Sequence, residues 1–125
     1  VVHVISNLRS SGPQRIVLDF SASDSLAHFE HKVVCVFSGR GELAQTFTDR
    51  RLSVEVCTFP MTDTIPLRPY RLARALGRVV ERTFPRRFAS VLRRMNADLV
   101  HTHVSSRIDR QVVGACDLAG LPLVW

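Results

Sequence analysis

Residues 1–20 read VVHVISNLRSSGPQRIVLDF, and this stretch decides the fold. Residues 1–6 form an apolar run that only His3 interrupts, and its β-branched side chains predict a buried strand. Ser11-Gly12-Pro13 then provides a helix start, because proline loses no hydrogen bond in the first helical turn. The stretch therefore predicts a strand, a tight turn and a helix from residue 13 to about residue 28.

The rest of the chain repeats this alternation. Further strands are expected at 31–37, 52–57, 98–101 and 122–125, and further helices at 42–50, 67–83, from 85 onward and at 107–119. Pro85 is expected to end one helix and open the next, and Gly120 to cap the last one. Strict alternation predicts a Rossmann-like α/β fold, an open parallel sheet with helices on both faces. Ligands then bind beyond the carboxyl ends of the strands.

The composition fits one domain, spanning residues 1–125. Of the 125 residues 46% are apolar, which is enough for a core, but no run approaches the ~20 apolar residues of a membrane span. No signal-peptide pattern occurs at the start. Residues 122–125 look like the beginning of a strand that is not complete, so we expect the domain to be truncated at its C-terminal end.

Three cysteines, Cys35, Cys57 and Cys116, lie far apart within apolar runs. Their odd number and the lack of any C-x-x-C spacing argue against a disulfide framework or a zinc site. They are expected to be buried, reduced thiols of a cytoplasmic protein.

The positive charge is concentrated in one segment. Residues 68–94 hold nine arginines and one acid, Glu81, whereas the remainder holds eight basic and ten acidic residues. The net charge of +6 is therefore a property of this segment and not of the whole domain.

Three motifs in order give the chain a family resemblance. They are H-V-I-S-N-L-R-S-S-G-P-Q-R-I-V-L-D-F at 3–20, F-S-G-R-G-E-L-A at 37–44 and A-D-L-V-H-T-H at 97–103. Together they resemble the N-terminal domain of retaining glycosyltransferases of family four, which have the two-domain GT-B fold. The resemblance covers nearly the whole chain.

The resemblance implies an enzyme that moves a sugar from a nucleotide-sugar donor to a glycan or lipid-linked acceptor with retention. The N-terminal domain carries most of the acceptor site, the enzyme's own C-terminal domain binds the donor, and no metal or other cofactor is usual. Two departures matter. Ser11-Gly12 stands where the family more often has two glycines, and the family's T-x-H-G motif after Pro122 is not reached before Trp125. The fragment is expected to be inactive alone.

Candidate donor-phosphate or acceptor contacts in the first turn are Gly12, Pro13 and Arg15. Free N–H groups and the helix dipole favour an anion at such a helix start. The alternative is an ordinary tight turn with a solvated arginine.

Candidates in the loop after the fourth strand are His103, Ser105 and Arg107. His103 stands at the carboxyl end of the strand, where an imidazole can hydrogen-bond an acceptor hydroxyl. His101 and His3 are expected to be structural, and His31 to lie at the opposite edge. No metal site is expected, because no third ligand lies near His101 and His103 in the sequence.

Arg71, Arg74 and Arg78 belong to a stripe of arginines at helical spacing. Such a stripe is either a solvated helix face or a contact to an anionic membrane surface or glycan. Nucleic acid is disfavoured because few aromatic residues interleave with the arginines. A cytoplasmic location is expected, either free or at the inner face of the membrane.

Two rival functions stay open at this point. One is a nucleotide-sugar epimerase of GT-B shape, and the other is a non-catalytic module that docks on anionic surfaces. A dinucleotide oxidoreductase is disfavoured, because the G-x-G-x-x-G fingerprint is absent after the first strand.

Overall fold

The structure is a computed structural model that describes residues 1–59, 70–104 and 107–125. For residues 70–78, 80, 81 and 107 it describes the backbone alone.

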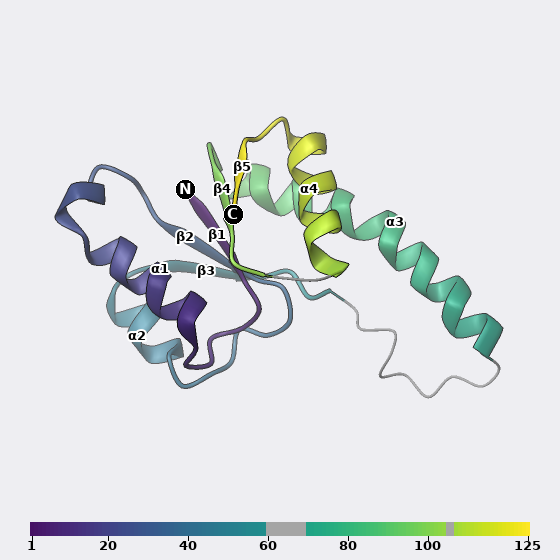
Figure 1. Cartoon of the computed structure of the whole chain (residues 1–125), viewed down its shortest axis with the longest axis horizontal. Coiled ribbons are helices and arrows are strands. Elements are labelled where there is room, and N and C mark those ends of the chain that lie inside the picture. The colour runs from purple at the N-terminus through teal and green to yellow at the C-terminus, as the bar shows by residue number, and fades with distance from the viewer. Residues whose placement is uncertain (60–69, 105–106) are drawn as a thin grey trace.

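A five-stranded sheet forms the centre of the domain (Figure 1). Its strands are β1 (Val2–Ile5), β2 (Lys32–Cys35), β3 (Ser53–Val56), β4 (Val100–Thr102) and β5 (Leu123–Val124). All neighbours pair in parallel, in the order β3-β2-β1-β4-β5. The predicted Rossmann-like open parallel sheet is therefore confirmed, and the strand order changes direction between β1 and β4.

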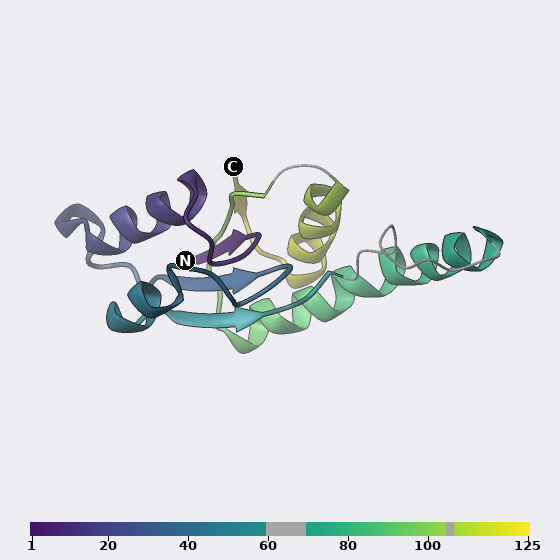
Figure 2. The same ribbon diagram turned by 90° about the horizontal axis from the view of Figure 1, so that it is seen from below.

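Helices cover both faces of this sheet (Figure 2). They are α1 (Gly12–Ala22), the short 3₁₀ helix η1 (Asp24–Leu26), α2 (Ala44–Asp49), α3 (Tyr70–Arg94) and α4 (Arg107–Ala119). One apolar cluster joins the sheet to α1 and α2, and a second joins it to α3 and α4. Within the described parts of the chain, no helix combines the length and the apolar character needed to cross a bilayer.

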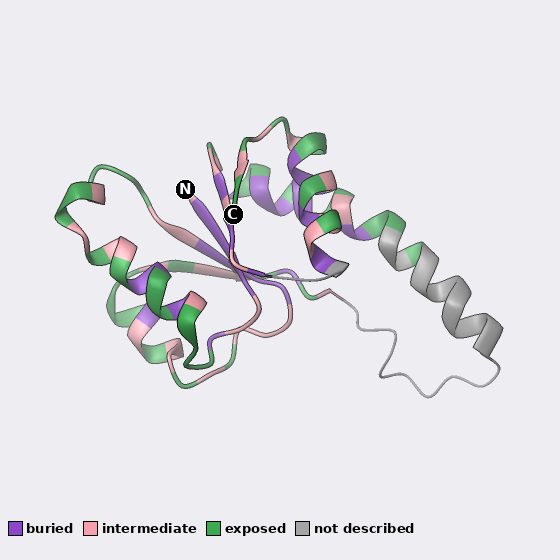
Figure 3. Ribbon diagram, in the orientation of Figure 1, coloured by how far each residue is buried: buried purple, intermediate pink, exposed green. Residues whose placement is uncertain are grey.

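The alternation of side chains along β1 explains the two clusters. Val2 and Val4 pack in the cluster with α3 and α4, whereas Ile5 packs in the cluster with α1 and α2. All four residues of β1 are buried, as Figure 3 shows for the centre of the sheet. A central parallel strand loses water on both faces, which is why the run reads as continuously apolar. His3 is the one polar side chain in it.

The helix after β1 ends six residues earlier than predicted. α1 ends at Ala22, and Ser23 adopts an extended conformation with ψ 123°. Serine and aspartate side chains compete for backbone partners, so they favour helix ends over helix interiors. Ser21 Oγ donates to the carbonyl of Leu18 at 2.8 Å, and Ser23 and Ser25 share a hydrogen bond of 2.8 Å. The predicted continuation to residue 28 is wrong for this reason.

The expected helix break at Pro85 is also wrong, because α3 continues through it. Proline removes one helical hydrogen bond and crowds the preceding turn. Here the buried rings of Phe84 and Phe88 hold the helix against the sheet on either side of the proline. Pro85 itself lies near Gly114 of α4, where a β-carbon would stand 3.8 Å from the proline ring. Packing between the two helices therefore offsets the local preference.

Three helices end in the same way. Just beyond each helix one residue has positive φ. Arg51 (56°) and Asn96 (49°) stand two residues after the last residues of α2 and α3, and Gly120 (70°) directly follows α4. In each case the next N–H bonds a carbonyl five residues back, as from Leu121 to Cys116 at 3.0 Å, which is a Schellman motif. The predicted cap at Gly120 is confirmed, and two further helix ends use residues other than glycine.

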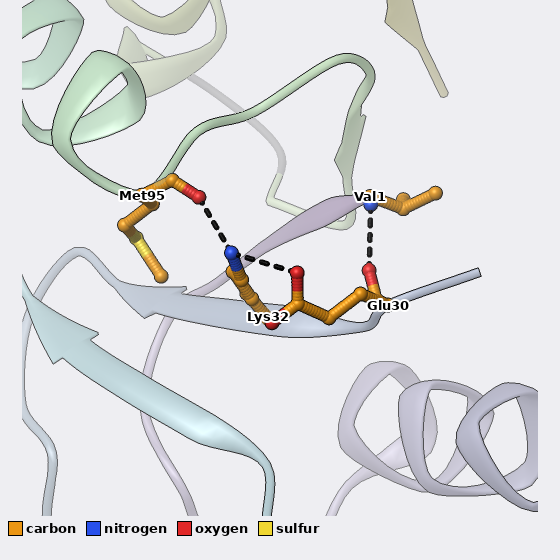
Figure 4. A network of polar contacts seen from close by, with 4 residues as sticks. All are labelled: Val1, Glu30, Lys32 and Met95. Atoms are coloured by element: carbon orange, nitrogen blue, oxygen red, sulfur yellow. Dashed lines mark hydrogen bonds and ion pairs between the residues drawn. The ribbon is translucent and has the colours of Figure 1, made fainter.

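The amino end of β2 is tied to the end of α3 through Lys32 (Figure 4). Lys32 Nζ donates to the carbonyl of Met95 at 2.8 Å and pairs with Glu30 Oε2 at 2.9 Å. The Val1 amino group donates to the carbonyl of Glu30 at 2.7 Å. A cation at a helix C-terminus is favourable, because it meets carbonyls that lack helical partners.

The three cysteines are buried free thiols, as predicted. Burial raises the pKa of Cys35 to about 12, and burial followed by the charge of Asp117 raises the pKa of Cys116 to about 11. Such thiols are protonated and unreactive at neutral pH.

Candidate functional site

The carboxyl ends of β1 and β4 meet where the strand order changes direction. β4 pairs with β1 on one side and β5 on the other, and the N–H of His103 donates to the carbonyl of Val4 at 2.8 Å. The turn from β1 into α1 and the residues after β4 therefore flank one switch point of the sheet. Open parallel sheets bind ligands at such a point.

The turn from β1 into α1 is held by a buried glutamine. Gln14 is 2% exposed, its Nε2 donates to the carbonyl of Asn7 at 2.7 Å, and its Oε1 accepts from Ser11 Oγ. Ser11 is the N-cap of α1, but its hydroxyl serves Gln14 and not the helix N–H groups. The first turn of the helix consequently keeps N–H groups without a side-chain cap.

The predicted contacts Gly12, Pro13 and Arg15 all lie at this helix start. A β-carbon on Gly12 would meet no atom within 4 Å, so packing does not require glycine there. Pro13 stands in the first turn of α1, as its fixed φ favours. Arg15 is exposed, and its guanidinium donates back to Ser10 Oγ at 3.2 Å.

A second loop, at 38–42, is fixed against the same turn. The N–H of Leu8 donates to the carbonyl of Arg40 at 3.4 Å, and the carbonyl of Leu8 accepts from Leu43 at 3.0 Å. A β-carbon on Gly41 would lie 2.0 Å from the Leu8 backbone, so only glycine permits this approach. The Ser10 N–H donates to Glu42 Oε2 at 3.0 Å, and backbone hydrogen bonds lower the pKa of Glu42.

His103 does not stand alone at the end of β4. Its Nε2 lies 3.3 Å from Nδ1 of His3, and its ring centroid is 4.0 Å from that of His101. His3 in turn places its Nε2 2.9 Å from Nδ1 of His31. The ring of Phe20, from α1, stacks on His101 at 5.8 Å. We call His3, His31, His101 and His103 the histidine cluster.

The imidazoles of the histidine cluster are neutral at pH 7. Burial, followed by the neighbouring imidazoles, lowers the pKa of His3 to about 3. Burial, with a smaller contribution from His101, lowers the pKa of His103 to about 4. Burial also lowers the pKa of His31 and of His101. Neutral imidazole is both a hydrogen-bonding group and the form that binds metals.

Sequence reasoning missed the histidine cluster in two ways. The apolar strand around His3 predicts a structural role, and the side chain is 1% exposed, but its ring also joins His103 to His31. His31 does lie at the amino end of β2, yet its ring reaches inward to His3 and is not remote from His103. Neighbours in the sequence offer no third metal ligand beside His101 and His103, whereas the sheet brings His3 next to both. The alternate spacing of His101 and His103 on a strand was the available signal.

The remaining predicted contacts are not placed at the site. Ser105 lies outside the described residues. Arg107 is the first residue of α4, and Arg71, Arg74 and Arg78 lie on α3, but the structure describes only their backbone. Their predicted roles therefore stay predictions.

Comparison with known proteins identifies the fold and no family. No protein-family profile matches the chain, and no curated protein matches it. Two crystal structures of the C-terminal domain of a hydrogenase from Pyrococcus furiosus are similar, with TM-scores of 0.59 and 0.60 at 16% and 14% identity. Each alignment covers 98% of this chain, and 87% or 88% of the other. At this identity the likeness extends to the α/β fold alone.

Proposed function

We propose that the chain is the N-terminal, acceptor-side domain of a retaining glycosyltransferase of GT-B fold. The observation that carries the proposal is the position of two motif residues. Gly12 and His103, which the family resemblance singled out, follow the two strands that flank the switch point of the sheet. A ligand at that point would meet the start of α1 and the end of β4 together.

The start of α1 suits the diphosphate of a nucleotide sugar. Its N–H groups lack a side-chain cap, Pro13 fixes the first turn, and Gly12 leaves space in which an anion can approach the backbone. Arg15 is exposed one turn along the helix and would add a charge-assisted hydrogen bond. The uncapped N–H groups, the open space at Gly12 and the positive charge of Arg15 thus all suit the negatively charged diphosphate of the donor.

His103 suits an acceptor hydroxyl. Because its Nε2 is engaged with His3, the hydroxyl would meet Nδ1. In the proposed reaction the bond from the anomeric carbon to the diphosphate oxygen breaks and a bond to the acceptor oxygen forms, with retention of configuration. The proton of the acceptor hydroxyl passes to the departing nucleoside diphosphate. The donor pocket would belong to the enzyme's own C-terminal domain.

The proposal includes a cytoplasmic location and a glycan or lipid-linked acceptor. If the acceptor is lipid-linked, Arg71, Arg74 and Arg78 would face the anionic inner surface of the membrane. These partners follow from the family resemblance and from the concentration of arginines in residues 68–94.

The test is turnover of a panel of nucleotide sugars by the protein at its natural full length. Gly12→Ala is the sharpest variant, because the added methyl group meets no protein atom and acts only on a ligand close to the backbone. The methyl group would displace the diphosphate from a backbone N–H and so remove one charge-assisted hydrogen bond. The donor KM is therefore expected to rise by about tenfold. Gly114→Ala adds the same methyl group against Pro85 and is the matched control, expected to leave KM unchanged.

Three outcomes would contradict the proposal. The first is an absence of transfer from every nucleotide sugar in the panel. The second is a donor KM that responds equally to Gly12→Ala and Gly114→Ala, and the third is an acceptor KM and turnover unaffected by His103→Ala. Interconversion of a nucleotide sugar without transfer would instead support the epimerase.

A further inference from the structure

We propose that His3, His101 and His103 form a binding site for one divalent transition-metal ion, with zinc as the best-fitting ion. One ring nitrogen from each of these three histidines lies within 4.8 Å of the other two. They come from two adjacent strands, since His3 pairs directly with His101 and His103 follows β4 on the same face. The proposal does not rest on the proposed glycosyltransferase function.

The spacing of the nitrogens fits a tetrahedral ion. Zinc binds imidazole nitrogen at about 2.0–2.1 Å, so two nitrogens on one tetrahedral zinc are about 3.3–3.4 Å apart. His3 Nδ1 and His103 Nε2 are 3.3 Å apart. The rings of His101 and His103 already lie at 4.0 Å between centroids, so small ring rotations would aim the third nitrogen at the same point.

His31 provides the support that a metal-binding histidine requires. A histidine bound to metal through one nitrogen almost always donates its other N–H to a neighbour, which fixes the tautomer and the ring orientation. If His3 binds through Nδ1, its Nε2–H donates to His31 Nδ1 at 2.9 Å. The Phe20 ring, 6.2 Å from His3 and 5.8 Å from His101, packs beside them and limits their rotation.

The donor set selects the class of ion. The group contains three imidazoles and no carboxylate or thiolate, so it does not suit calcium or magnesium, which require oxygen ligands. Zinc, nickel and copper(II) accept imidazole, and zinc is the one that favours a tetrahedron. Three protein ligands leave a fourth position for water or another ligand. His101 and His103 are half-buried, which gives an ion a route of access.

The experiment uses the full chain without a histidine tag, after treatment with a chelator. Zinc is titrated in competition with a chromophoric chelator, and cobalt(II) is titrated to read the geometry from its visible spectrum. We expect one zinc ion per chain and the intense visible bands of tetrahedral cobalt. Loss of a residue that only hydrogen-bonds a metal ligand typically weakens metal binding by about 10–100-fold, so His31→Ala should weaken zinc binding by about tenfold. His101→Ala and His103→Ala remove ligands themselves and should each weaken zinc binding by more than about 100-fold.

His28→Ala is the matched control, because His28 is exposed and outside the histidine cluster. It should leave zinc affinity unchanged. Circular dichroism must show that each variant is folded. If His103→Ala does not fold, the wild-type chain still decides, because cobalt bound at the site must shift the ring protons of His3, His101 and His103 in the proton NMR spectrum. The proposal is overturned if cobalt gives the weak spectrum of the aqueous ion, or if His28→Ala weakens zinc binding as much as His101→Ala.

Discussion

Acid is expected to destabilise the metal-free chain through His3, and the size of the effect follows from its burial. The ordinary pKa of 6.5 applies in the unfolded state, and burial lowers the pKa to about 3 in the folded state. Above pH 6.5 the ring is neutral in both states. As the pH falls below 6.5, only the unfolded chain takes up the proton, so stability decreases until the pH reaches the folded pKa.

One pKa unit corresponds to about 1.4 kcal/mol, so His3 alone predicts a loss of about 2 kcal/mol between pH 7 and pH 5. That is a large share of the roughly 5–15 kcal/mol by which domains are stable. His103 acts in the same direction but is half-buried, so solvent screening reduces its contribution.

The assay is urea unfolding at pH 7 and at pH 5 in the presence of a chelator. His3→Gln keeps a polar side chain but cannot titrate, so it should lose about 2 kcal/mol less than the wild type between the two pH values. His28→Gln, at an exposed position, should lose as much as the wild type. Equal acid losses for His3→Gln and the wild type would refute the assignment of the effect to His3.

Two further predictions concern backbone geometry. Gly41→Ala should lower the free energy of unfolding by about 2 kcal/mol or more, because its β-carbon would lie 2.0 Å from the Leu8 backbone. Gly12→Ala has open space and should change it by less than about 0.5 kcal/mol, so equal urea midpoints would contradict the argument. Arg51→Gly should raise the free energy of unfolding by about 1 kcal/mol, because it relieves a positive φ of 56°. Arg50→Gly, which loses a 2.9 Å bond to the Leu18 carbonyl, should lower it, and thermal melts that show the reverse order would disprove the reasoning.

The fold was readable from the sequence because burial on both faces makes the central strands apolar throughout. Residues 1–6 and 31–37 predicted β1 and β2 to within two residues at each end. One prediction was wrong because packing overrides the local preference of the sequence. The sequence around Pro85 does not show that the packing of Phe84, Phe88 and helix α4 keeps the chain helical there. Conversely, Ser23 ended α1 through local hydrogen bonds that the apolar periodicity did not reveal.

The sequence predicted that the start of α1 and the end of β4 follow strands of one parallel sheet, but it did not predict the histidine cluster. The start of α1 and the end of β4 were singled out because alternating elements place ligands at strand ends. The histidine cluster was missed because it depends on strand register. His3 meets His101 only because β4 lies beside β1, and the two residues are 98 positions apart in the sequence.

The contact between Gly41 and Leu8 has a consequence for motion. Because Leu8 both donates to and accepts from the loop after β2, the turn into α1 cannot swing outward unless two backbone hydrogen bonds break. The two loops therefore form one rigid wall beside the switch point. A ligand that binds against this wall would need little ordering of the loop, so less affinity is lost to conformational entropy.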